Sequence, residues 1–190
     1  MDEDRPFSPL KIDIPSPQWD ETAKTTQRAM RLTAQINRLT YDDLAQVREL
    51  FSELTLQSID EGFALIPPFY SSYGLDIRVG KKVFINQGCT IYDMGGVEIG
   101  DRVMIGPNVS LITTSHPLEP DLRRAYIEAK PIKIENNVWI AAGVTIIGGV
   151  TIGENSAIGA GAVVTKNVPP NCFVAGSPAK IIRKLDRTEE

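Results

Sequence analysis

Residues 134–164 read IENNVWIAAGVTIIGGVTIGENSAIGAGAVV, and every sixth residue from Ile134 onward is aliphatic. The same period of six holds upstream, where two extra residues follow Ile91 and a longer insertion follows Leu111. Such a period fits neither an amphipathic helix nor an alternating strand, and it is typical of β-helix coils. The aliphatic residues that share it are Val79, Ile85, Ile91, Ile99, Ile105, Leu111, Ile134, Ile140, Ile146, Ile152, Ile158 and Val164.

Three six-residue units turn the chain once around a triangle, so each unit points one aliphatic side chain into a narrow interior. Gly and small residues beside these positions allow the corners to form. Stacked coils pair their backbone groups with the coils above and below, which leaves free strand edges only at the two ends. We therefore expect a mainly β domain over residues 67–185, with the periodic residues in its core and none of them catalytic.

Residues 1–66 show no such period and are expected to form an arm and a helical cap. The first 17 residues hold four prolines, which predicts an arm that packs irregularly or stays loose. A second helix is predicted after Asp42 or Asp43, and Pro67 stops helical structure. Before it, a helix is predicted over Asp20–Leu39 from an imperfect apolar stripe: Ala23, Met30 and Ala34, with Leu32, Ile36 and Leu39.

Composition excludes several classes of protein. The chain has 190 residues with 20 Lys and Arg against 24 Asp and Glu, and this mild acidity argues against binding nucleic acid. Its apolar runs are too short for a membrane helix, and its first residues, MDEDR, do not resemble a signal peptide, so we expect a cytoplasmic protein with no membrane contact. Two cysteines give no disulfide framework. One histidine cannot form a multi-histidine metal centre unless several chains contribute, so no metal is expected.

The long interruption of the repeat, residues 115–131, reads SHPLEPDLRRAYIEAKP and contains His116, the single histidine. Long loops in compact domains are often functional, and an imidazole is a suitable base for deprotonating a hydroxyl group. The alternative is a structural or merely exposed histidine. The shorter interruption, IYDMGG, places Asp93 either in a pocket wall or in a simple turn, and Asn86 lies at a corner where backbone geometry alone could explain it. Trp139 is expected to point outward.

Three further segments of the sequence are informative. PPFYSSYG at 67–74, KPIKIENNVWIAAGVTIIGGVTIGENSAIGAGAVVTKNVPPN at 130–171 and VAGSPAKIIRKL at 174–185 join the SHP-containing loop. Together with the six-residue period, they resemble the galactoside/maltose O-acetyltransferase family of hexapeptide acyltransferases, over residues 67–185. The resemblance implies a left-handed parallel β-helix assembled as a homotrimer, with active sites between neighbouring chains.

The resemblance also implies a role for each matching residue. His116 would be the general base for direct attack of an acceptor hydroxyl on acetyl-CoA, and the amide of Ala142 would stabilise the oxyanion. Ser72, Asn86 and Asp93 would bind the acceptor. The positions that would bind coenzyme A are Ala142, Ala160, Thr165, Lys166, Lys180 and Arg183; a solvated tail is the alternative for the last two.

One departure leaves the acceptor open. The family's short N-terminal stretch, a Gly soon followed by an aromatic and an acidic residue, is replaced here by PSPQWDETAKTTQRAM at 15–30. Asp20 and Arg28 could reach an acceptor by analogy, although a solvated helix face explains both, and solvated charge also explains Arg123 and Arg124. The expected acceptor is a sugar or similar small hydroxyl compound. The alternatives are a xenobiotic or amino-sugar acetyltransferase and a non-catalytic hexapeptide scaffold.

Overall fold

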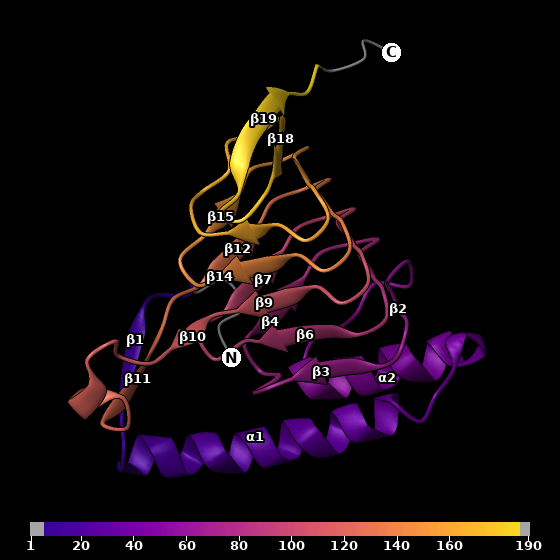
Figure 1. The fold of residues 1–190 in the computed structure, drawn as a ribbon. Helices are drawn as coiled ribbons and strands as arrows, with labels where there is room; N and C mark the ends of the chain where they lie inside the picture. Colours follow the sequence, from indigo (N-terminus) through magenta and orange to yellow (C-terminus); the bar gives the residue numbers. More distant parts are fainter. Residues whose placement is uncertain (1–5, 187–190) are drawn as a thin grey trace.

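The computed structural model describes residues 6–186, which form a three-sided prism of stacked coils standing on two helices (Figure 1). Face 1 consists of β4 (Ile77–Val79), β7 (Val97–Ile99), β12 (Ile132–Ile134) and β15 (Thr151–Ile152). Face 2 consists of β2 (Ala64–Leu65), β5 (Phe84–Ile85), β8 (Met104–Ile105), β13 (Trp139–Ile140), β16 (Ala157–Ile158) and β18 (Cys172–Ala175), with β19 (Lys180–Lys184) antiparallel at its end. Face 3 consists of β3 (Phe69–Ser71), β6 (Cys89–Tyr92), β9 (Ser110–Ile112), β14 (Thr145–Ile147) and β17 (Val163–Val164).

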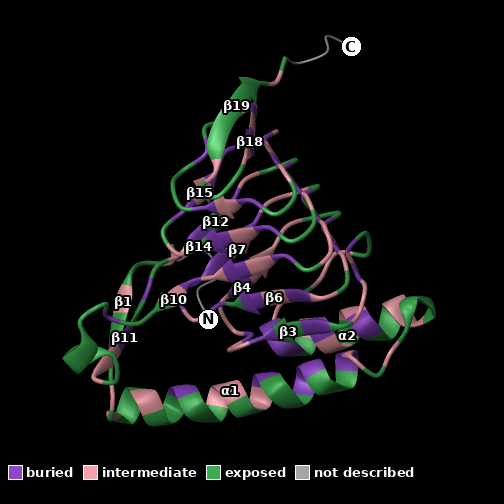
Figure 2. Cartoon of the chain, viewed as in Figure 1, coloured by how far each residue is buried: buried purple, intermediate pink, exposed green. Residues whose placement is uncertain are grey.

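The periodic aliphatic residues form vertical columns inside this prism. On face 2, for example, Ile85, Ile105, Ile140 and Ile158 are direct neighbours in the parallel register. Eleven of the twelve predicted positions are buried, which confirms the interpretation of the period (Figure 2). Val79, on the end strand β4 of its face, is only partly buried and packs against the core.

Corners of the prism need residues that tolerate a left-handed backbone. Asn137, Asn155 and Asn171 adopt φ values of 56°, 58° and 56° at successive levels of one corner. Their side chains form a ladder, in which Asn137 Nδ2 donates to Asn155 Oδ1 at 2.9 Å and Asn155 Nδ2 donates to Asn171 Oδ1 at 3.1 Å. Asparagine therefore serves both the turn geometry and the stacking of coils.

The two predicted helices are present, but only part of the apolar stripe predicted for the first one is buried. Helix α1 spans Pro17–Ile36, with the Ser16 hydroxyl accepting a hydrogen bond from the Trp19 amide, and α2 spans Leu44–Thr55 after the short helix η1 (Tyr41–Asp43). Ala23, Met30 and Ala34 are exposed. Leu32 and Ile36 are buried as predicted, and they share the buried face with Thr22, Ala29 and Thr33. None of the helices within residues 6–186 is long and apolar enough to cross a membrane.

Helix α2 closes the lower end of the prism with an aromatic cluster. Phe51 stacks on Phe63 with ring centroids 4.7 Å apart and meets Phe69 edge-on at 5.8 Å. All three rings are fully buried, so this cluster joins the helices to the first coil and shields the open end of the core.

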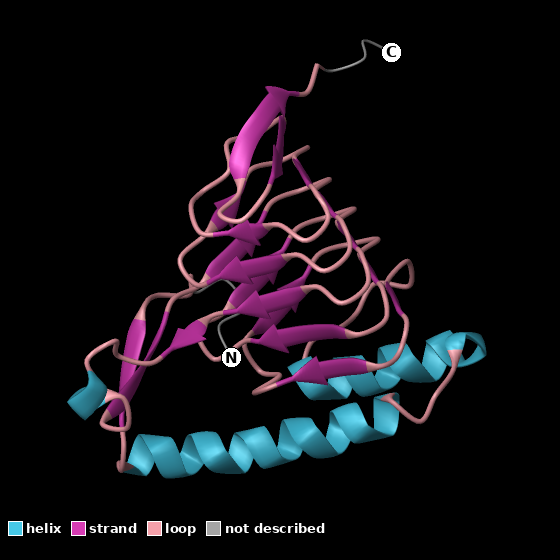
Figure 3. Ribbon diagram, in the orientation of Figure 1, coloured by secondary structure: helices cyan, strands magenta, loops and turns pink. Residues whose placement is uncertain are grey.

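The N-terminal arm is more ordered than its prolines suggest. Strand β1 (Leu10–Asp13) pairs antiparallel with β11 (Tyr126–Ala129), which also pairs with β10 (Thr114–Ser115) (Figure 3). The expectation of an irregular arm is wrong at this segment, because the free backbone groups of β11 provide a strand edge for it to bind.

All insertions in the repeat leave the prism at one corner, between face 3 and face 1. They are residues 72–76 after β3, 93–96 after β6 and 113–131 after β9. The last of these contains β10, β11 and the short helix η2 (Pro120–Leu122). Since the three levels are stacked, Ser72, Asp93 and His116 are carried by neighbouring levels of the same corner.

The asparagine ladder provides a test of this corner geometry. Asn155→Ala and Asn155→Gly remove the same two side-chain hydrogen bonds. Only alanine is strained in the left-handed backbone conformation, which lowers the stability of that variant by about 1–2 kcal/mol. Glycine in turn gives the unfolded chain more conformational entropy, which lowers stability by about 0.4–1 kcal/mol. We therefore expect Asn155→Ala to be roughly 1 kcal/mol less stable than Asn155→Gly. Urea unfolding midpoints of both variants measure the difference. Equal midpoints would contradict the assigned role of the backbone conformation.

Candidate active site

His116 follows β10 directly, and its ring is held by the loop it belongs to. Its Nδ1 lies 2.8 Å from the carbonyl oxygen of Arg123. A carbonyl oxygen can only accept, so the geometry assigns the hydrogen to Nδ1 and leaves Nε2 of the neutral ring with a free lone pair. The ring is therefore oriented, and its second nitrogen is able to accept a proton.

The loop itself is braced by the N-terminal arm. The amide of Ile14 donates to the carbonyl of Ala125 at 2.7 Å and extends the pairing of β1 with β11. Within the loop, the guanidinium of Arg123 donates to the carbonyl of Leu118 at 3.2 Å. The segment that holds His116 is thus part of a three-stranded sheet and not a free loop. Arg123 remains exposed while it makes this contact, in agreement with the expectation of solvated loop charge.

On one side of His116 lies a pocket of about 560 Å³, between helix α1 and the coils. Ser72 and His116 both line it, as expected for a shared acceptor site. Sequence reasoning missed the other half of the wall, which includes Trp19, Met30 and Tyr92. The exposed apolar residues of α1 were the available signal, and they were interpreted as core.

Asp93 lies behind this wall and not in it. Its side chain is fully buried, and its carboxylate accepts hydrogen bonds from the Ser71 hydroxyl at 2.9 Å and the Gly74 amide at 2.6 Å. It also accepts from the Ser72 hydroxyl at 3.4 Å and the Tyr73 amide at 3.0 Å. In the described chain Asp93 therefore shapes the turn that presents Ser72, and its contact with an acceptor stays a prediction.

A second carboxylate lies close to Asp93. Burial, and to a lesser extent the charge of Asp93, raises the pKa of Asp76 to about 6, while Arg78 opposes the shift. Burial also raises the pKa of Asp93, against the hydrogen bonds from Ser71 and the backbone. The corner that presents Ser72 thus contains two carboxylates whose ionisation is costly.

The remaining candidate residues lie elsewhere on the prism. Asn86, Ala142 and Ala160 line a hollow of about 630 Å³ on face 2, together with the outward-pointing Trp139. Trp139 is half exposed, as predicted. Asn86 has no left-handed backbone; its side-chain oxygen accepts from the Gln87 amide at 2.8 Å.

The amide of Ala142 is free of internal bonding. Among the hydrogen bonds of residues 6–186, its carbonyl accepts from Gly161 at 2.9 Å, but its N–H donates to no protein acceptor. Ala142 and Ala160 are both exposed at the corner between face 2 and face 3. This corner therefore offers a backbone donor to a bound molecule.

The four polar candidates for coenzyme binding occupy the C-terminal end of the prism. Thr165 and Lys166 follow β17, and Lys180 and Arg183 lie on β19. All four are exposed. They are therefore accessible, but the single chain does not bring them to one place with His116.

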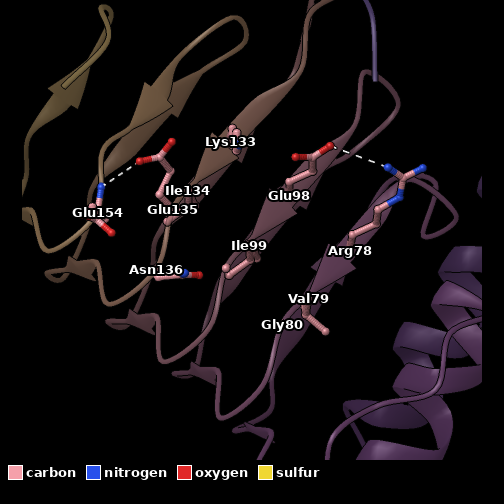
Figure 4. A pocket seen from close by; sticks show the side chains of 11 residues that line it. Arg78, Val79, Gly80, Glu98, Ile99, Lys133, Ile134, Glu135, Asn136 and Glu154 are labelled. Carbon is pink, nitrogen blue, oxygen red and sulfur yellow. Dashed lines mark hydrogen bonds and ion pairs between the residues drawn. The ribbon is translucent and has the colours of Figure 1, made fainter. Parts of the chain in front are cut away.

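Faces 1 and 2 of the prism differ in the charge of their outward side chains. On face 1, Arg78 is in register with Glu98 and Glu98 with Lys133, and the Arg78–Glu98 ion pair measures 3.7 Å (Figure 4). A hollow of about 640 Å³ on this face is lined by these compensating charges and by none of the predicted site residues. In contrast, the outward column of face 2 is uncharged: Ala64, Phe84, Met104, Trp139, Ala157 and Phe173.

No group of three or more His, Cys, Asp or Glu side chains in the described residues could hold a metal ion.

A prism of hexapeptide coils with a histidine-bearing loop at one corner defines the class of hexapeptide-repeat acyltransferases. Comparison of the sequence with family models agrees: "Bacterial transferase hexapeptide (six repeats)" matches residues 131–166, and "Hexapeptide repeat of succinyl-transferase" matches residues 76–112.

Sequence similarity to known proteins identifies the family of this chain more narrowly. Galactoside O-acetyltransferase of Escherichia coli K12 is 44% identical over 141 residues, which cover 74% of this chain and 67% of the relative. The Lactococcus lactis enzyme of the same name is 36% identical over 168 residues, covering 87% and 81%. The chain belongs to the galactoside/maltose O-acetyltransferase family and is an acetyltransferase.

Solved structures agree with the fold. A maltose O-acetyltransferase from Clostridium difficile 630 superposes with a TM-score of 0.85 at 36% identity, covering 88% of this chain and 90% of that one. A Vibrio cholerae hexapeptide-repeat acetyltransferase complexed with acetyl coenzyme A gives 0.82 at 36% identity and 93% coverage of both chains. The fold is accordingly the left-handed parallel β-helix that the family resemblance implied.

The raised pKa of Asp76 gives a pH-dependent prediction. Its folded pKa of about 6 lies above the ordinary value of 3.8 for an aspartate, so the native state binds this proton more tightly than the unfolded state does. Stability from this group is present below pH 4 and lost as pH rises through 6. Asp76→Asn cannot ionise, so its stability relative to the natural protein should increase between pH 4 and pH 7.5. Thermal unfolding at both pH values measures this, with the exposed Asp20→Asn as control; a constant difference for Asp76→Asn would contradict it.

Proposed function

We propose that this protein transfers the acetyl group of acetyl-CoA to a hydroxyl of a sugar or similar small acceptor, with His116 as general base. The observation that carries the proposal is the contact of His116 Nδ1 with the Arg123 carbonyl, which leaves Nε2 free beside a pocket of acceptor size. The names of the galactoside and maltose O-acetyltransferase relatives support the choice of a hydroxyl acceptor.

The reaction needs no covalent enzyme intermediate. Nε2 of His116 accepts the proton of the acceptor hydroxyl as its oxygen attacks the thioester carbon. The tetrahedral intermediate collapses, the carbon–sulfur bond breaks, and the imidazolium returns its proton to the departing thiolate. The products are the acetyl ester and free coenzyme A. No cysteine nucleophile has a part in this scheme: Cys89 and Cys172 are both buried, and burial raises the pKa of the Cys89 thiol to about 11.

Three groups would assist this transfer, one stabilising the oxyanion and two contacting the acceptor. The free N–H of Ala142 is the proposed donor to the oxyanion of the tetrahedral intermediate. The Ser72 hydroxyl, held by Asp93, would orient the acceptor, and Asp93 would act as a positioning residue. Asn86 would contact the acceptor from the face 2 hollow.

Acetyl-CoA is the proposed co-substrate and no metal is required. Complexes with acetyl coenzyme A in the Vibrio cholerae neighbour and with coenzyme A in a galactoside acetyltransferase support this choice. The pantetheine arm would lie over Ala142 and Ala160, where small side chains leave room. The polar and cationic residues near its other end would be Thr165, Lys166, Lys180 and Arg183.

The site is proposed to be shared between chains of a homotrimer. Ala142 and Ala160 occupy the corner between faces 2 and 3, whereas His116 occupies the corner between faces 3 and 1, so one chain cannot apply both groups to one acetyl-CoA. Three-fold rotation would bring the uncharged outward column of face 2 of one copy toward the His116 loop of the next. The charged face 1 would then remain outside.

Substitution of His116 tests the proposed base. His116→Ala and His116→Asn should both lower acetyl-CoA-dependent thiol release by roughly 10²- to 10⁴-fold. Asparagine retains an N–H that can donate to the Arg123 carbonyl, so it separates loss of a base from loss of loop order. Arg124→Ala, an exposed change in the same loop, is the control. If His116→Asn kept full activity, the histidine would be a positioning residue and the proposed mechanism would be wrong.

A further inference from the structure

Phe7 anchors the N-terminal arm to the coils, away from helix α1. Its ring packs against Gly96, the last residue of the 93–96 insertion, so closely that a methyl group on Gly96 would overlap Cγ and Cδ2 of the ring. On β4, the guanidinium carbon of Arg78 lies 4.1 Å from the centre of the same ring, which is a cation–π contact. Phe7 therefore occupies a seat that exists because residue 96 has no side chain.

This seat belongs to the stacked coils and not to the loop that carries His116. The amide of Gly96 donates to the Asp93 carbonyl at 2.7 Å, and the Gly96 carbonyl accepts from the Ile132 amide at 2.9 Å. Ile132 is the first residue of β12, so Gly96 is hydrogen-bonded into face 1. Gly96 also adopts a φ of 91°, a backbone conformation that favours glycine. The ring of Phe7 thus rests on a fixed support.

Strand β1 needs such a support because pairing alone gives it few contacts. It is a four-residue edge strand in which Ile12 is the one buried residue. Short strands with one neighbour are marginal unless they also pack against something else. Pro9 directly precedes β1, and its fixed φ limits the freedom of the link between the strand and Phe7. The arm is therefore held twice, by Phe7 on the coils and by pairing with β11.

A chain of backbone hydrogen bonds connects the arm to the imidazole. On one edge of β11, β10 pairs with the last two residues, whereas β1 on the other edge pairs with all four. Beyond them, the Ala125 carbonyl accepts from the Ile14 amide, and the Ala125 amide donates to the Leu122 carbonyl at 2.8 Å. This last bond closes the turn that contains Arg123, whose carbonyl oxygen holds Nδ1 of His116. The arm thus fixes the oxygen that orients the imidazole.

Resting on the proposed role of His116 as base, we propose that Phe7 is a positioning residue for acetyl transfer. By seating the arm on Gly96 and Arg78, its ring holds the Arg123 carbonyl where it keeps the hydrogen on Nδ1 and leaves the lone pair on Nε2. Phe7 lies at face 1, so it acts through the loop and not by contact with a substrate.

Substitution of Phe7 tests this role kinetically. With methyl β-galactoside and saturating acetyl-CoA, Phe7→Ala should lower kcat for thiol release by roughly tenfold, because the base is no longer held in one direction. The KM for acetyl-CoA should change by less than about twofold, since the proposed coenzyme-binding residues lie elsewhere. Phe7→Tyr keeps the ring and should retain kcat. Tyr41→Ala, which removes an exposed ring on η1, is the control, and thermal unfolding shows that each variant folds.

The single histidine allows the same variants to be tested without substrate. In tag-free protein labelled with ¹⁵N-histidine, the NMR signals of the two ring nitrogens of His116 distinguish the Nδ1–H from the Nε2–H tautomer. The natural protein and Phe7→Tyr should show the Nδ1–H tautomer, and Phe7→Ala should show a mixture of both. A merely structural role of Phe7 would leave this signal unchanged.

A second variant approaches the contact from the other side. Gly96→Ala places a methyl group where the ring lies, so it should displace Phe7 and give the same tautomer mixture. In the Phe7→Ala background, Gly96→Ala should change neither the tautomer mixture nor kcat further, because there is no ring left to displace.

The outcomes separate this proposal from the proposed function. A natural tautomer in Phe7→Ala would overturn the proposal, whether or not kcat falls. A further tautomer change caused by Gly96→Ala in the absence of the ring would also overturn it, because the turn itself would then hold the loop. A tautomer mixture with undiminished thiol release would support the hold of Phe7 on the imidazole and would overturn His116 as the base.

Discussion

Parallel stacking of coils is the constraint on which the rest of this structure depends. Each backbone amide in a strand must meet a carbonyl one level away, and the aliphatic columns must fill an interior only one side chain wide per face. Extra residues can therefore leave only at corners. The three insertions leave at the same corner, so the fold gathers Ser72, Asp93 and His116 without any contact between distant domains.

Order at that corner is supplied by segments outside the repeat. Strand β1 completes a small sheet with the loop, and the Arg123 carbonyl fixes the imidazole of His116. Asp93 holds the turn of Ser72 from within, and helix α1 closes the pocket from outside. The cap and arm thus contribute to the site as well as to stability, while the coils contribute the second group of residues on another face.

The sequence predicted the coils well because a six-residue aliphatic period has few other structural explanations. It singled out His116 because the lone histidine lies in the long insertion, and the structure has this residue lining the α1 pocket; its role as base stays a prediction. It misassigned Met30, since periodicity alone cannot tell a core stripe from a pocket wall on a helix with apolar residues on two faces. Strand β1 was missed because its partner β11 is remote in sequence, and the burial of Asp93 depends on amides of residues 73–76 that meet it only after folding.

The central claim, an acetyltransferase site shared between chains, can be tested by mixing two disabled variants. His116→Ala keeps the Ala142 corner, and Ala142→Glu keeps the loop, so each alone should be nearly inactive. Unfolded together and refolded at equal ratio, random assembly makes about one site in four intact, and about a quarter of the natural thiol release should return. A mixture no more active than its components, despite mixed assemblies by mass spectrometry, would contradict a shared site.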